Sequence, residues 1–169
     1  DHLDATSIFV PYIETLNLPN LTVAAPDMGA TNRAIGYAKY FNVEMVVCDK
    51  HRKRANEIES MTVIGDVEGR DIVLIDDLVD TAGTLTRAAN LLCECGATSV
   101  RAFCTHPVLS GKAYERIENS KLTEVVVCDT LPVRPGARKI RVLSAAELFA
   151  KVVRRVYTHE SISPLFVKI

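Results

Sequence analysis

The residues best suited to chemistry lie in a thirteen-residue stretch that begins as a buried strand and turns into a helix. The apolar run Ile72–Ile75 predicts a strand covered on both faces, and it delivers two adjacent carboxylates, Asp76 and Asp77, to its carboxyl end. The turn that follows is made of Asp80, Thr81, Ala82, Gly83 and Thr84. Its small residues, two hydroxyls, exposed amides and helix N-terminus favour a phosphate group. Vicinal carboxylates beside such a cradle suit ribose hydroxyls or a Mg²⁺ ion. The structural alternative, in which Asp80 or Thr81 only caps the helix, explains less of this pattern.

A second candidate loop lies between an expected strand and an expected helix. It reads Pro26, Asp27, Met28, Gly29, Ala30, Thr31, Asn32 and Arg33. Gly29 gives the backbone freedom, Asp27 could hold a metal ion, and Arg33 could meet phosphate oxygens. From these residues alone, a turn that caps the next helix is an equal alternative.

A third candidate is the basic run Asp49–Arg54, which contains Lys50 and Arg52. Such a run usually forms a solvated face. Nuclear localisation or RNA contact is a further alternative, but the chain has few aromatic residues to interleave with the charges.

Short apolar runs alternate with helix-like stretches along most of the chain. The strands and helices that these stretches predict must position the three candidate segments. The expected strands are Leu21–Ala25, Glu44–Cys48, Met61–Ile64, Ile72–Ile75, Ser99–Cys104, Glu124–Cys128 and Lys139–Val142. The expected helices are Ala30–Phe41, Thr84–Cys95, Lys112–Asn119 and Ser144–Tyr157. This order predicts an α/β fold, with a parallel sheet flanked by helices on both faces. In such sheets ligands bind at the loops that follow the strands' carboxyl ends.

Composition limits the class of protein. The chain has 169 residues, enough for one domain. Its 20 basic and 21 acidic residues give a net charge of −1, which argues against a nucleic-acid partner. No apolar run approaches the ~20 residues of a membrane span, and no signal peptide is expected. Five cysteines without a CxxC pair fit reduced thiols, so we expect a cytoplasmic protein.

The thirteen-residue stretch resembles the phosphoribosyl diphosphate (PRPP) motif of the phosphoribosyltransferase-type fold, in the form found in the ribose-phosphate diphosphokinase (PRPP synthetase) family. The resemblance implies that Asp80 to Thr84 hold the 5-phosphate of ribose 5-phosphate and that Asp76 and Asp77 hold its hydroxyls. It places the family's catalytic Lys and Arg on Lys50 and Arg52, with Arg52 also near the ribose 5-phosphate. A mobile catalytic loop belongs at this position in the family.

The loop from Asp27 to Arg33 resembles the family's diphosphate-binding loop, and Asp27 would contribute to binding Mg²⁺. Here the chain departs from the usual pattern, because Ala30 stands at the second glycine position and Asn32 replaces a common lysine. If the second glycine needs a positive φ, Ala30 strains the loop by roughly 1 kcal/mol.

The resemblance covers the whole chain but only about the second half of a synthetase. Residues 1–169 would be one phosphoribosyltransferase-like domain, with the N-terminal half and its metal-binding His absent. The family's reaction joins ribose 5-phosphate and MgATP to give PRPP and AMP, and we expect the isolated half to be inactive. Ser161 and Ser163 resemble part of an effector site for ADP or phosphate between subunits of a hexamer.

Two other functions remain open at this level. The chain could be a phosphoribosyltransferase that consumes PRPP, although no hood segment for a nucleobase is evident. It could also be a non-catalytic regulatory subunit of the synthetase family, a role that does not require an intact Lys50 and Arg52.

Overall fold

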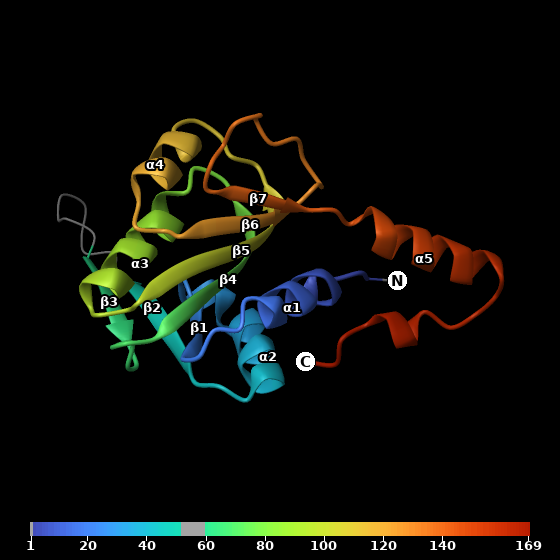
Figure 1. Ribbon diagram of the computed structural model, residues 1–169, viewed down its shortest axis with the longest axis horizontal. Coiled ribbons are helices and arrows are strands. Elements are labelled where there is room, and N and C mark those ends of the chain that lie inside the picture. The colour runs from blue at the N-terminus through green and yellow to red at the C-terminus, as the bar shows by residue number, and fades with distance from the viewer. Residues whose placement is uncertain (1, 52–59) are drawn as a thin grey trace.

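The computed structural model describes residues 2–51 and 60–169, and the side chain of His51 lies outside this description. Its strands form one sheet in the order β3-β2-β1-β4-β5-β6-β7 (Figure 1). The strands are β1 (Leu21–Ala25), β2 (Met45–His51), β3 (Ser60–Ile64), β4 (Asp71–Val79), β5 (Ser99–Pro107), β6 (Glu124–Cys128) and β7 (Ile140–Leu143). The α-helices are α1 (Thr6–Thr15), α2 (Thr31–Phe41), α3 (Gly83–Glu94), α4 (Ala113–Asn119) and α5 (Ala146–Tyr157).

The predicted α/β architecture is confirmed, with one exception at the edge of the sheet. All neighbouring strands pair in parallel except β2 and β3, which are antiparallel from Val47↔Ile64 to His51↔Ser60. Only residues 52–59 connect these two strands. A parallel crossover needs a dozen or more residues, so this connection is too short for one.

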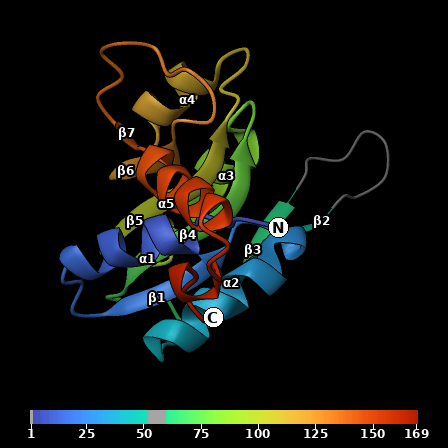
Figure 2. The same cartoon turned by 90° about the vertical axis from the view of Figure 1, so that its right-hand side faces the viewer.

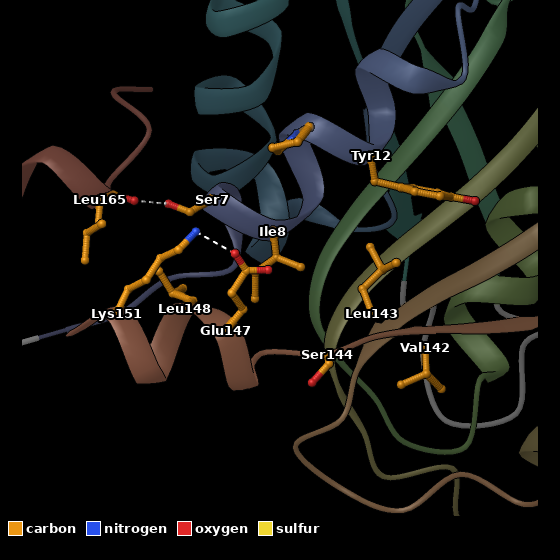
Figure 3. A pocket seen from close by; sticks show the side chains of 11 residues that line it. Ser7, Ile8, Tyr12, Val142, Leu143, Ser144, Glu147, Leu148, Lys151 and Leu165 are labelled. Atoms are coloured by element: carbon orange, nitrogen blue, oxygen red, sulfur yellow. Dashed lines mark hydrogen bonds and ion pairs between the residues drawn. The ribbon is translucent and has the colours of Figure 1, made fainter. Parts of the chain in front are cut away.

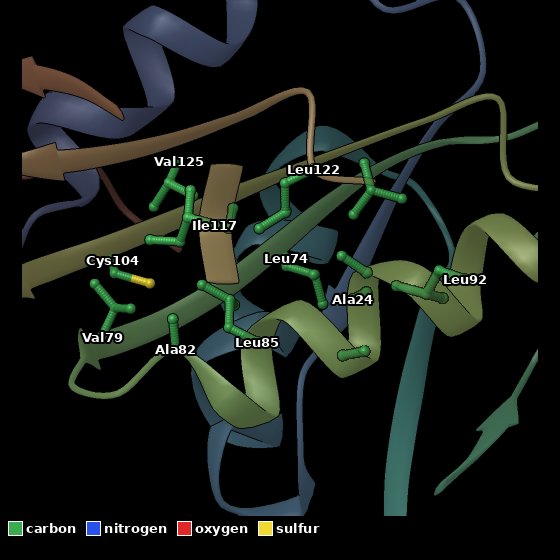
Figure 4. Close-up of a cluster of buried hydrophobic side chains, with 14 of the residues drawn as sticks. Ala24, Leu74, Val79, Ala82, Leu85, Leu92, Cys104, Ile117, Leu122 and Val125 are labelled. Atoms are coloured by element: carbon green, nitrogen blue, oxygen red, sulfur yellow. The ribbon is translucent and has the colours of Figure 1, made fainter. Parts of the chain in front are cut away.

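Helices cover both faces of the sheet and bury two hydrophobic clusters. On one face, α1 and α2 pack Phe9, Ile13 and Ala34 against side chains such as Val73 and Phe103. On the other face, α3 and α4 cover residues that include Leu74 and Ala102 (Figure 4). Because β1, β4, β5 and β6 are covered on both sides, their sequences read as continuous apolar runs.

Helix α1 is not among the elements predicted from the sequence, yet the structure forms it over Thr6–Thr15. Pro11 lies inside this helix, where proline removes a backbone hydrogen bond. Phe9, Val10 and Ile13 are buried against the sheet, and their packing compensates for that loss.

Strand β4 is longer than predicted, which changes the setting of the acid pair. The strand continues through Asp76 and Asp77 to Val79, because β5 extends equally far and pairs with it up to Val79↔Pro107. Asp76 and Asp77 therefore lie on the last part of a strand and not after its end.

Helix α5 stands apart from the layers that cover the sheet (Figures 1 and 2). None of its residues is buried. The chain then returns toward α1 through the short 3₁₀ helix η2 (Ser163–Leu165), where the Ser7 hydroxyl donates to the Leu165 carbonyl over 2.8 Å. At the C-terminus, Gly36 of α2 leaves room for Ile169, whose Cδ1 would lie 2.6 Å from a Cβ at that position.

Replacing one buried and one exposed phenylalanine by alanine should show that the core contributes much more to the free energy of unfolding than α5 does. Phe103 is fully buried, and its ring meets Phe9 edge-on with 5.4 Å between centroids. Phe103→Ala should lower the free energy of unfolding by about 3–5 kcal/mol. Phe149, which is 52% exposed on α5, should cost less than about 0.5 kcal/mol when replaced by alanine. Chemical denaturation measures both variants, and equal losses would contradict this division.

Candidate functional site

The fold brings two of the three predicted loops together at the carboxyl edge of the sheet. Strands β1 and β4 are parallel neighbours, with Ala24 opposite Leu74, so the segments that follow them emerge side by side. Arg33, at the start of α2, reaches across to the acid pair on β4. Its Nη2 lies 2.9 Å from Asp77 Oδ2 and its Nη1 lies 3.4 Å from Asp76 Oδ1. One guanidinium therefore connects the two loops.

The two carboxylates of the pair have opposite pKa shifts. Burial raises the pKa of Asp76 to about 6, and the negative charges of Asp77 and Asp27 add to this effect. Burial also acts on Asp77, but the Arg33 guanidinium and the Leu78 amide, 2.8 Å from Oδ1, outweigh it and lower the pKa of that carboxyl. Arg33 therefore stabilises the charge of one carboxylate, while the other stays poorly solvated.

The predicted phosphate loop, Asp80 to Thr84, joins β4 to α3 through a left-handed residue. Ala82, which is buried, has φ 58° and ψ 11°. A non-glycine residue in this conformation costs roughly 1–2 kcal/mol. Helix α3 begins at the next residue, Gly83, so the first amides of the helix lie beside the loop, where they favour an anion.

Two residues outside the three candidate loops hold this loop in place. Arg116, on α4, donates from Nη1 to the Thr81 carbonyl over 2.8 Å. Ser110, before α4, donates its hydroxyl to the Asp80 carboxylate and its amide to the Asp80 carbonyl, the latter over 3.1 Å. They lie 30 and 35 residues from their partners in the chain, so only the folded structure shows these contacts.

The second loop, Asp27 to Arg33, forms the 3₁₀ helix η1 (Met28–Ala30) directly before α2. Asp27 caps it, because its Oδ1 accepts from the Ala30 amide over 3.1 Å. The expected strain at Ala30 is absent, since its φ of −84° is right-handed and suits any residue. The freedom expected of Gly29 is not used either, because Gly29 has no positive φ. The strained non-glycine residue of the two loops is Ala82 instead.

The third predicted group is only partly within the described structure. Lys50 lies on β2 opposite Met61, and it is half-buried. Strand β2 runs parallel to β1, so it ends at the same edge of the sheet. Arg52 lies outside the described residues.

Protein side chains alone do not form a metal cage at this edge. Among residues 2–51 and 60–169, no three His, Cys, Asp or Glu side chains are grouped to hold an ion. Mg²⁺ commonly takes one or two carboxylates together with substrate phosphates and water. Asp27, whose Oδ2 is not used in the cap, fits that limited role.

A cavity of about 390 Å³ adjoins the acid pair. Its lining includes Arg33, Asp76 and Asp77, together with Tyr37 and His106. The imidazole Nδ1 of His106 lies 3.0 Å from the Thr130 hydroxyl oxygen, a contact that fixes the ring at the end of β5.

A second hollow of about 430 Å³ lies elsewhere, between α1 and α5 (Figure 3). Tyr12, Ser144 and Leu148 line it, and an ion pair of 2.7 Å joins Lys151 to Glu147 at its rim. None of the predicted site residues lines this hollow.

The predicted effector serines lie in the tail that follows α5. Arg155 donates from Nη1 to the Ser161 carbonyl over 2.7 Å, and the Ser161 hydroxyl accepts from the Ser163 amide over 3.2 Å. A cation thus lies beside this turn, away from the acid pair and the phosphate loop.

The fold and the geometry together define an α/β protein whose candidate ligand site lies at the carboxyl edge of a parallel sheet. A family model described as the phosphoribosyl synthetase-associated domain matches residues 51–167. The chain belongs to this family.

Curated relatives match this chain over part of their own length. It is 48% identical over 167 residues to the ribose-phosphate pyrophosphokinase of Wolinella succinogenes, covering 99% of this chain and 54% of that protein. The ribose-phosphate pyrophosphokinase of Campylobacter jejuni is 47% identical over 167 residues, with the same shares covered. The chain therefore spans about half the length of the curated relatives it matches.

Solved structures confirm the expected phosphoribosyltransferase-type fold. The crystal structure of phosphoribosylpyrophosphate synthetase from Mycobacterium smegmatis superposes with a TM-score of 0.84 at 35% identity, covering 94% of this chain and 52% of that one. The adenine phosphoribosyltransferase (APRTase) of Giardia lamblia, solved with 9-deazaadenine, gives a TM-score of 0.57 at 18% identity, covering 73% of this chain and 76% of that one. This second match shows the fold alone. Within the described residues, every helix is too short or too polar to span a membrane.

The pH dependence of stability should reveal the environment of Asp76. Its raised pKa means that the folded chain binds this proton more tightly than the unfolded chain does. Ionisation of Asp76 therefore destabilises the fold as the pH rises from about 4 to above about 6. Asp76→Asn should unfold at a higher temperature than the parent at about pH 8, and the difference should shrink toward about pH 4.

Asp77→Asn is the matched variant, and its change in unfolding temperature should have the opposite sign. The lowered pKa of Asp77 gives stability that is present above its ordinary pKa and is lost in acid. This variant should unfold at a lower temperature than the parent at about pH 8 and approach it below about pH 3. Circular dichroism during heating measures both, and shifts of the same sign would contradict this account of the pair.

Proposed function

We propose that the chain carries the ribose 5-phosphate half of a ribose-phosphate diphosphokinase site. The observation that carries the proposal is the pairing of Arg33 with Asp76 and Asp77, which joins the diphosphate-type loop to the PRPP-type motif at one edge of the sheet. The relatives named ribose-phosphate pyrophosphokinase, and the family to which the chain belongs, support it.

In this proposal the sugar phosphate is bound by β4 and the turn into α3. Asp76 and Asp77 accept hydrogen bonds from the ribose hydroxyls, and Asp80 to Thr84 surround the 5-phosphate. The first amides of α3 supply donors, and the helix dipole favours the negative charge.

The diphosphoryl group of ATP would lie between the two loops and the end of β2. The C1 hydroxyl oxygen of ribose 5-phosphate forms a bond to the β-phosphorus and loses its proton. The bond from the β-phosphorus to the oxygen bridging it to the α-phosphorus breaks, which releases AMP and leaves PRPP. Lys50 and Arg52 would stabilise the charge on the transferring group, and Arg33 would meet its oxygens.

Mg²⁺ would supply charge neutralisation on the phosphate oxygens when it is bound. Asp27 is the proposed protein ligand, and the substrate phosphates would provide the remaining oxygens. The loop positions the Asp27 carboxylate through the Ala30 amide, so that one oxygen stays available.

The proposal includes the relation of this chain to a longer enzyme. Residues 1–169 would act as one domain, equivalent to the C-terminal half of a PRPP synthetase, and would make little PRPP alone. A cytoplasmic hexamer, with ADP or phosphate as an effector near Ser161 and Ser163, completes the proposal.

Calorimetric titration of the 169-residue chain with ribose 5-phosphate tests the proposed sugar site. Replacing both Asp76 and Asp77 by Asn should weaken binding by about 10- to 100-fold, because charged hydrogen bonds to two hydroxyls are lost. Asp66→Asn is the control, since Asp66 is exposed just before β4, at the opposite edge of the sheet, and should leave affinity unchanged. Unaltered binding by the double variant would overturn the assignment.

An activity assay separates the three candidate functions. PRPP formation from ribose 5-phosphate, ATP and Mg²⁺, measured with the chain inside a full-length enzyme, should fall by at least about a hundredfold on Lys50→Ala. A full-length parent that assembles but forms no PRPP would support a regulatory role instead, and undiminished turnover of Lys50→Ala would overturn the catalytic role of Lys50. Release of pyrophosphate from PRPP and a nucleobase would support a phosphoribosyltransferase.

A further inference from the structure

The left-handed residue in the phosphate loop needs an external constraint. Ala82 is the residue that turns the chain from β4 into α3, and its φ of 58° is one that glycine adopts freely and alanine does not. Without contacts that fix it, an alanine here would return to a right-handed or extended conformation. The loop must therefore be held by groups outside it.

Arg116 is the side chain that acts on the peptide next to Ala82. Its Nη1 donates to the carbonyl of Thr81 over 2.8 Å, from a helix 35 residues further along the chain. The same nitrogen would lie 3.7 Å from a Cβ at Gly83, so the guanidinium sits against the turn itself. The Thr86 hydroxyl fixes the other side of the residue, donating to the Ala82 carbonyl over 2.7 Å.

The orientation of this peptide decides where the Ala82 amide points. The Thr81–Ala82 peptide bond, like every other in the described part of the chain, is trans, so the carbonyl of Thr81 and the N–H of Ala82 point in opposite directions. With the carbonyl held toward Arg116, the N–H is directed away from it. Among the described residues, no acceptor takes a hydrogen bond from this N–H. This N–H could therefore donate to a ligand oxygen that enters the turn, although only 4% of Ala82 is exposed.

We propose that Arg116 is a positioning residue for sugar-phosphate binding: it holds the Thr81–Ala82 peptide so that the Ala82 amide faces the 5-phosphate. This inference rests on the proposed function and adds to it a residue from α4. Arg116 acts through the loop backbone and does not touch the phosphate.

A double-mutant cycle with Ala82→Gly tests this role. Arg116→Met removes the hydrogen bond and keeps much of the side chain's bulk, and it should weaken ribose 5-phosphate binding by about tenfold. Glycine adopts the left-handed conformation without strain, so in the Ala82→Gly background the same change should cost only about twofold. Equal losses in both backgrounds would overturn the positioning role and indicate direct charge–phosphate attraction. Arg116→Lys, which keeps a donor and the charge, should bind better than Arg116→Met.

Arg138→Met is the matched control for the loss of an arginine. Arg138, in the segment between β6 and β7, is exposed and pairs over 3.5 Å with Glu118 of α4, the helix that also carries Arg116. Its replacement should leave ribose 5-phosphate affinity unchanged. A tenfold loss here too would show that general positive charge, and not the contact with Thr81, governs binding.

The ligand-free conformation of Ala82 gives a readout that does not depend on the proposed function. The ¹³Cα and ¹³Cβ shifts of Ala82 report its backbone conformation, and Arg116→Met should move them toward right-handed values while Arg138→Met does not. Unchanged shifts in Arg116→Met would overturn the inference even if ribose 5-phosphate binds. If Arg116→Met changes the shifts but the parent chain does not bind ribose 5-phosphate, the positioning role of Arg116 is supported and the proposed ligand is contradicted.

Discussion

The ion pairs of Arg33 with Asp76 and Asp77 are the contacts on which the candidate site depends. They join residues 43 and 44 positions apart, and they do so because β1 and β4 are parallel neighbours whose ends meet at one edge. Without a cation at this point, two adjacent carboxylates and nearby Asp27 would repel one another across a partly buried region. The strand order places Arg33 beside the acid pair. Its positive charge in turn allows Asp76 and Asp77 to lie at the end of a strand that helices cover on both faces.

The phosphate loop is organised differently, through backbone conformation. Arg116 donates to its Thr81 carbonyl, and Ser110 donates to its Asp80 carboxylate. The left-handed Ala82 allows β4 to turn directly into α3 and brings the first helical amides to the end of the strand. The cost of this conformation is met by contacts from the segment before α4 and from α4 itself, which belong to the layer packed on the same face of the sheet. The helix layer therefore supports both the core and the loop.

The sequence predicts the fold and the candidate loops well where one local pattern is sufficient. The apolar runs locate all seven strands to within a few residues, and the carboxyl-edge rule places Asp27 to Arg33 beside Asp76 to Thr84. The errors arise where distant partners decide. Pro11 is a residue that argues against a helix in sequence, so α1 is not predicted. Pairing with β5 makes β4 longer than its apolar run. The residue with a strained backbone is Ala82 and not Ala30. The contact of Arg116 with this loop could not be found locally, because α4 meets the loop only after the sheet has formed.

The opposite pKa shifts of the acid pair show what the site lacks before a ligand binds. Arg33 lies closer to Asp77 than to Asp76, so it favours the charge of the more exposed carboxylate and leaves the more buried one poorly compensated. A ligand that presents hydroxyl donors to Asp76 would stabilise its ionised form, whereas a neutral apolar ligand would not. A ligand that also carries an anionic group would draw on Arg33 and on the amides at the start of α3. In the proposed function, a polyhydroxylated phosphate would satisfy both requirements, whereas a simple anion would satisfy only the second.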